Sequence, residues 1–82
     1  MGRGARMTPK KLGRKLKQIR LGLGFKQEEM RLALNSNVKG TVVHEGYVSQ
    51  YERGLREPVL VVLLAYARLG GVTIDYLADD DL

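Results

Sequence analysis

Residues 45–54 read EGYVSQYERG, and they carry the most specific structural pattern in the chain. The pattern predicts a helix over 45–53, which Gly54 ends because glycine readily adopts the left-handed conformation that follows a helix. The inner side of this helix is expected to carry Val48, Tyr51 and Glu52, since residues three or four positions apart share one face. The segment therefore predicts a short helix that buries one face and exposes a polar one.

Two more helices are expected before this segment. Thr8 is a good N-cap and Pro9 suits a first helical position, so the first helix is expected to begin there. Its apolar residues recur every three or four positions and form a one-sided stripe. The stripe consists of Leu12, Leu16, Ile19 and Leu23. A second helix is expected over 27–34, with Glu28 and Glu29 in the first turn, where the helix dipole favours acids.

The rest of the chain supplies a connection and two further helices. Residues 35–43 contain turn signals and are expected to form a loop or a small hairpin. A fourth helix is expected over 60–69, and a fifth begins after Thr73 as its N-cap. The residues expected to face inward from the fourth helix are Leu60, Leu63, Leu64 and Ala67. Together these elements predict an all-α, compact five-helix bundle.

Charge is distributed unevenly along the 82 residues, which carry 14 basic and 9 acidic side chains and a net charge of +5. The first 27 residues contain no acid, whereas three consecutive Asp residues stand near the end. Such a separation suggests a basic face that meets a polyanion. We expect a flexible basic arm over 1–7, a helical domain over 8–78 and an exposed acidic tail over 79–82.

Composition excludes several function classes. Cysteine is absent and histidine occurs once, which excludes thiolate zinc sites, sites with several His and cysteine nucleophiles. Ser36 and Ser49 are the only serines, and neither has a convincing base and acid beside it in the sequence. We therefore expect no enzyme activity, no cofactor and no metal.

The longest apolar run, residues 59–67, is nine residues long, far below the roughly 20 that span a bilayer. We expect a soluble cytoplasmic protein that has no membrane partner. From a chain of this length we expect no separate small-molecule effector domain.

A known family matches this arrangement. The segment Ser49-Gln50-Tyr51-Glu52-Arg53-Gly54-x-Arg56-x-Pro58, with Arg20 and Gln27 before it and residues 71–77 after it, resembles the phage-repressor-type (Xre-like) helix-turn-helix proteins of bacteria and phages. The resemblance runs over residues 12–77. It implies a bundle of the lambda-repressor-like type in which the second and third helices read double-stranded DNA.

Two departures from the family pattern stand out. The turn between the second and third helices usually has three or four residues, and here residues 35–43 make it longer, so the third helix follows an elongated turn. Lys26 stands where the family usually has a capping Ser or Thr. The first departure bears on where the third helix sits, and the second removes a capping oxygen.

The resemblance implies a small, sequence-specific transcriptional regulator, most simply a nucleoid-associated repressor. In such motifs the third helix lies in the major groove, with its first residues at base edges. The candidate base-reading residues are Glu45, Gly46, Tyr47, Ser49 and Gln50. The candidate phosphate contacts are Lys26, Gln27, Lys39, Arg53 and Arg56. The resemblance also assigns Arg20 and Glu52 to a structural ion pair between the first and third helices.

The apolar run over 59–67 overfills a single inward stripe. Residues left outside that stripe would form an uncovered apolar strip, which on a small protein marks a partner surface. The candidate residues are Val59, Val61, Val62 and Ala65. We expect them to support a homodimer on two half-sites about 34 Å apart. An alternative is that residues 59–62 are irregular and buried.

A second function from another class stays open. The same fold could serve as a protein-interaction adaptor, such as an antitoxin or an anti-repressor, with the apolar strip as its working surface.

Overall fold

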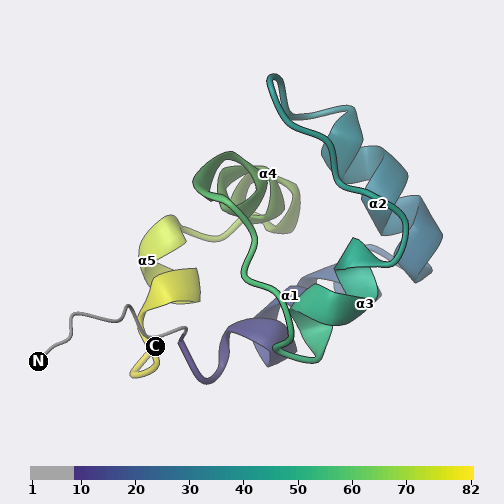
Figure 1. Ribbon diagram of the computed structural model, residues 1–82. Helices are drawn as coiled ribbons and strands as arrows, with labels where there is room; N and C mark the ends of the chain where they lie inside the picture. The colour runs from purple at the N-terminus through teal and green to yellow at the C-terminus, as the bar shows by residue number, and fades with distance from the viewer. Residues whose placement is uncertain (1–8) are drawn as a thin grey trace, which may run out of the picture.

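Helices account for all the regular secondary structure in residues 9–82, which are the residues that the computed structural model describes. The expected basic arm over 1–7 and the Thr8 cap lie outside the described residues. The helices are α1 (Leu12–Gly22), α2 (Gln27–Asn35), α3 (Tyr47–Glu52), α4 (Leu60–Gly70) and α5 (Ile74–Ala78). The prediction of an all-α bundle of five helices is confirmed (Figure 1).

The core lies where α1 meets three other helices. Leu12, Leu16 and Ile19 of its predicted stripe are buried and Leu23 is half-buried, so the stripe faces inward as expected. Helix α1 packs against α3, α4 and α5, and α2 packs against α3 and α4. Because α1 packs against α3 and also against α4 and α5, its position fixes the orientation of α3 relative to the rest of the bundle.

The beginning of α1 differs from the expectation. The helix starts at Leu12 rather than at Pro9, because Pro9 lies in a turn in which its carbonyl accepts a hydrogen bond from the Leu12 N–H at 3.3 Å. The cap of the helix comes from the far end of the chain. The Asp80 carboxylate accepts hydrogen bonds from the Lys10 and Lys11 N–H groups, each at 3.0 Å. A negative charge at this position also interacts favourably with the helix dipole.

Lys15 completes this contact between the two ends. Its side chain is buried, and its Nζ donates hydrogen bonds to the carbonyl of Tyr76 and to that of Asp79, the latter at 2.8 Å. The ammonium thus lies at the C-terminal end of α5, where cations are favoured. The expectation of an exposed acidic tail is therefore wrong for Asp80, which is half-buried against α1, while Asp79 and Asp81 are exposed.

Asp80 gives a pH dependence to stability. Its pKa lies below the usual 3.8 because the N–H groups of Lys11 and Lys10 stabilise the carboxylate. A pKa lowered by folding contributes stability that is present above pH 3.8 and is lost as the pH falls through the folded pKa. We expect Asp80→Asn to lower stability at neutral pH, and the difference from wild type to shrink in acid. Urea unfolding at several pH values measures it; a difference that grows in acid contradicts the assignment.

The connection between α2 and α3 is a long loop over residues 36–46, which projects beyond the end of α2 (Figure 1). It contains turns and no strand, so of the two expectations the loop is correct. One contact ties it to the helix: the Asn35 side chain accepts from the Val43 N–H at 2.8 Å and donates to the Val43 carbonyl at 3.0 Å. Val43 is fully buried, which brings the chain back to the bundle before α3 begins.

Helix α4 faces the core only partly as expected, because Ala67 is buried and Leu63 packs against the core, whereas Leu60 does not. Its buried residues are Val62, Ala65, Tyr66 and Ala67. Leu60 is 69% exposed, whereas Tyr66 is fully buried. The inward position of Leu60 is therefore wrong, as is the expectation that Val62 and Ala65 lie outside the core. Tyr66 is the largest fully buried side chain, and placing it inward sets the rotation of the helix.

Val59 precedes α4, and Leu60 and Val61 are its first two residues; all three side chains are exposed. Val59 has extended backbone angles, but it is 55% exposed, so the alternative of a buried irregular segment is also wrong there. At the other end of the helix, α5 starts as predicted, with the Thr73 hydroxyl accepting a hydrogen bond from the Tyr76 N–H at 3.0 Å. No helix in residues 9–82 is both long and apolar enough to cross a membrane.

Candidate nucleic-acid interface

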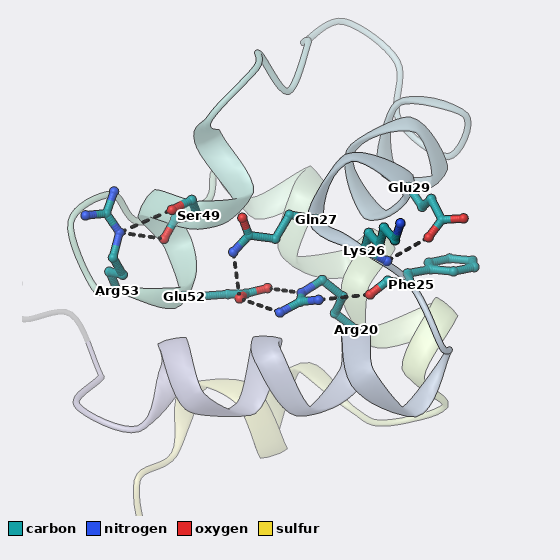
Figure 2. A network of polar contacts seen from close by, with 8 residues as sticks. All are labelled: Arg20, Phe25, Lys26, Gln27, Glu29, Ser49, Glu52 and Arg53. Carbon is teal, nitrogen blue, oxygen red and sulfur yellow. Dashed lines mark hydrogen bonds and ion pairs between the residues drawn. The ribbon is translucent and has the colours of Figure 1, made fainter.

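A polar network joins the first three helices beneath the candidate surface (Figure 2). The Glu52 carboxylate accepts hydrogen bonds from Arg20 Nε at 2.6 Å, from Arg20 Nη2 at 3.1 Å and from Gln27 Nε2 at 3.2 Å. Arg20 also donates through Nη1 to the Phe25 carbonyl at 2.9 Å. The pair expected from the sequence is thus in contact, and it links α1 to α3 and to the start of α2.

This pair is largely withdrawn from water. The side chains of Arg20 and Glu52 are only 11% and 4% exposed. The hydrogen bond to Glu52 raises the pKa of Arg20, so the guanidinium remains charged. Since a buried charge is costly without its partner, the pair holds α1 and α3 in one relative position.

Helix α3 has one apolar side, which is buried in the core, and one polar side, which faces away from it. Val48 and Tyr51 are buried in the core, as predicted. The helix is shorter than expected and starts at Tyr47, because Gly46 takes a left-handed φ of 86° that only glycine adopts readily. Glu45 and Gly46 therefore lie in the turn before the helix, where both are exposed. The remaining base-reading candidates, Tyr47, Ser49 and Gln50, are half-buried.

Gln50 is held by a residue beyond the helix. Its Oε1 accepts a hydrogen bond from Arg56 Nε at 2.7 Å. The Arg56 guanidinium in turn stacks on the Tyr47 ring, with its carbon 3.9 Å from the ring centroid. Three candidate residues are thus brought together, and the contact restricts the rotamers of Gln50. Within residues 9–82 the Gln50 amide N–H groups make no hydrogen bond, so they are able to donate to a base.

Ser49 and Arg53 form a second pair along the same helix. Arg53 Nε donates to the Ser49 hydroxyl at 3.2 Å and to the Ser49 carbonyl at 3.4 Å (Figure 2). Arg53 is exposed, so its terminal nitrogens face solvent at the end of α3. The Arg53 guanidinium thus adds a positive charge at the C-terminal end of α3, one helical turn after Ser49.

The start of α2 lies beside the polar face. Lys26 precedes the helix and supplies no capping oxygen, but its N–H donates to Glu29 Oε1 at 2.7 Å, which satisfies one free N–H of the first turn (Figure 2). Gln27 is exposed and stands at the helix N-terminus, where free N–H groups and the helix dipole attract anions. The exposed Lys26 adds a cation next to that position.

A depression of about 180 Å³ separates the start of α2 from α3. Its lining includes Gln27 and Arg31 on one side and Gly46 and Ser49 on the other. Candidate residues from the two helices therefore share one surface. Lys39 does not line this depression and is exposed in the projecting loop.

Two residues that support this surface were not predicted from the sequence. Arg31 donates to the Glu28 carboxylate through Nε at 2.9 Å and to the Val43 carbonyl through Nη1 at 3.4 Å. The hydrogen bonds that the Glu28 carboxylate accepts from Arg31 lower the pKa of Glu28. Asn35 is the other residue, through its contact with Val43. The spacing of Glu28 and Arg31 could have indicated their pairing, but nothing in the sequence indicates the partner of Asn35.

Comparison with known proteins agrees with this geometry. A family model described as Helix-turn-helix matches residues 16–77, which include α2, the long loop and α3. Searches of curated proteins and of solved structures gave no match. The match confirms the resemblance and the lambda-repressor-like type of bundle. The chain therefore belongs to the Xre-like helix-turn-helix family of DNA-binding domains.

Proposed function

We propose that this domain is a sequence-specific transcriptional regulator that places α3 in the major groove of double-stranded DNA and represses by occupying a promoter. The observation that carries the proposal is the exposed turn of Glu45 and Gly46, which stands directly before the first residues of α3. Val48 and Tyr51 anchor the helix behind this turn in the core. A rigid helix with this distribution presents its first residues to base edges, as helix-turn-helix motifs do.

Backbone contacts are proposed for residues on both sides of α3. Gln27 and Lys26 at the start of α2 would bind a phosphate at the helix N-terminus. Arg53 and Arg56 at the end of α3 are exposed cations. Phosphate contacts of this kind position a protein on the duplex, while the base contacts specify the sequence.

Selection of bound duplexes from a random pool tests the proposal. We expect enrichment of a palindrome with half-sites about 34 Å apart, because a two-fold dimer would place one α3 in each half-site. Binding that depends on salt but enriches no sequence would contradict sequence-specific regulation and leave only backbone attraction.

Gln50 is the residue with the clearest proposed role in base reading. A glutamine amide can pair with both N6 and N7 of adenine, so Gln50→Ala should relax the preference at one base pair by about 1–3 kcal/mol. Because Arg56 holds the Gln50 carbonyl oxygen, Arg56→Ala should weaken binding to every sequence and also relax the same position. Affinities for the selected site and its single-base variants measure both effects. An unchanged base preference in Gln50→Ala would contradict the assignment.

An exposed apolar patch supports the homodimer. The patch is defined as the exposed large apolar residues of segment 55–61, at the start of α4 and in the connection before it: Leu55 (66% exposed), Val59 (55%), Leu60 (69%) and Val61 (44%). Large exposed apolar side chains gathered on a small domain commonly mark a protein contact. The same patch favours the second candidate function, a protein-interaction adaptor. The random-pool selection separates the two, since an adaptor enriches no palindrome.

A further inference from the structure

A basic groove of about 340 Å³ lies between the first half of α1 and the end of α3. It is distinct from the depression between α2 and α3, because the lining residues of the two differ. Its floor is formed where Gly13 of α1 approaches the backbone of α3 at Glu52, with no side chain in between. Five cations surround the groove, namely Lys10, Arg14, Lys17, Arg53 and Arg56.

Acids in the described part of the chain offset only part of the positive charge of the groove. All five cations are exposed, and within residues 9–82 none forms an ion pair with a carboxylate. Glu52 is the acid that lines the groove, and its carboxylate is neutralised by Arg20 from below. Asp80 binds the N–H of Lys10 at one end, so Arg14 and Lys17 are the α1 cations whose charge is least offset. Such a surface attracts a polyanion.

The groove is continuous with the proposed DNA surface. Arg53 and Arg56 belong to both, since they line the groove and also contact Ser49 and Gln50 through their Nε atoms. Their terminal guanidinium nitrogens make no hydrogen bond within residues 9–82 and remain available. A DNA strand that leaves α3 past Arg53 would therefore enter the groove and meet α1.

The spacing of the α1 cations fits a nucleic-acid backbone. Arg14 and Lys17 lie three residues apart on one face of a helix, about 4.5 Å along its axis. Successive phosphates of one DNA strand are about 3.4 Å apart along the duplex axis. The two side chains are long enough to cover that difference, so each could contact one of two neighbouring phosphates.

We propose that this groove is a second DNA-backbone site, in which Arg14 and Lys17 contact two successive phosphates beside the half-site that α3 reads. The inference rests on the proposed function, which it extends from the helix-turn-helix unit to α1. Arg14 and Lys17 add affinity without reading bases, because they contact phosphates only.

The salt dependence of binding tests the groove. The slope of log K against log salt is negative, and each lost phosphate contact makes it less steep by about 0.9. Arg14→Ala/Lys17→Ala should therefore reduce the steepness by about 1.8. Between about 50 and 200 mM salt, the wild type should then lose about tenfold more affinity than the variant. The preference among single-base variants of the selected site should stay as in wild type. Replacing both residues with Gln, which keeps most of each aliphatic stem, should give the same slope.

A control with the same net charge is Lys11→Ala/Arg68→Ala, because both residues are exposed and neither lines the groove. Its slope should match that of wild type. An unchanged slope in the Arg14/Lys17 variants would contradict phosphate binding in the groove. An equal loss of steepness in the control would contradict it as well. If the wild type selects no sequence but the slopes still differ as stated, phosphate binding in the groove is supported and sequence-specific regulation is contradicted. If the wild type binds no duplex, both fail.

Discussion

Glu52→Gln should destabilise the domain by about 3 kcal/mol, because it leaves the buried Arg20 guanidinium without its counter-ion. The substitution keeps the size of the side chain but removes the charge that accepts two hydrogen bonds from Arg20. Arg20 cannot respond by losing its proton, since arginine stays charged in proteins. For a small domain, a loss of this size is a large fraction of the total stability. Urea unfolding monitored by circular dichroism measures it.

A double replacement separates the cost of an unpaired charge from the worth of the pair. Buried ion pairs are often replaced by apolar residues with little loss, so Arg20→Met/Glu52→Met should recover much of the stability that Glu52→Gln loses. DNA affinity should fall in Glu52→Gln, because Gln27 loses the charged acceptor that holds it at the start of α2. Unfolding of Glu52→Gln within about 0.5 kcal/mol of wild type would show that the pair is not structural.

Gly13→Ala should destabilise the domain by about 2 kcal/mol, since it inserts a methyl group between two helices in contact. A Cβ at this position would lie 2.6 Å from the Glu52 carbonyl oxygen and 2.9 Å from that of Tyr51. Both atoms belong to the backbone, so relief requires α1 to move away from α3. That movement would also stretch the Arg20–Glu52 pair, and DNA affinity should fall together with stability.

Gly22→Ala is the matched control for this substitution. Gly22 is the last residue of the same helix, and a Cβ there meets nothing within 4 Å. Alanine has a higher helix propensity than glycine by about 1 kcal/mol, so Gly22→Ala should be neutral or stabilising. Thermal unfolding of the two variants should differ clearly. Equal melting temperatures would contradict the close packing of α1 on α3.

How much the sequence predicts depends on whether the determining contacts are local. The stripe of α1 and the inner face of α3 follow from periodic spacing, and both lie in the core. The expected inward face of α4 is right for Ala67 and wrong for Leu60, because residues 59–67 are all apolar and carry no periodicity. There the burial of Tyr66, which depends on the other helices, selects the face.

Contacts between distant residues were not predictable by the same reasoning. Asp80 caps α1 from 70 positions away, and no pattern in the sequence joins the two ends. In the candidate site, the family resemblance brought Arg20 and Glu52 together across 32 positions, which spacing alone would not do. The contact of Arg56 with Gln50 was missed because Arg56 follows the end of α3, outside any helical repeat.

We propose above that the polar side of α3 enters the major groove. Methylation interference on the selected duplex tests it directly, because dimethyl sulfate modifies guanine N7 in the major groove and adenine N3 in the minor groove. We expect methylation of guanine N7 within each half-site to block binding, and methylation of adenine N3 there to have little effect. Interference by adenine N3 alone would place the contact in the minor groove and contradict the claim.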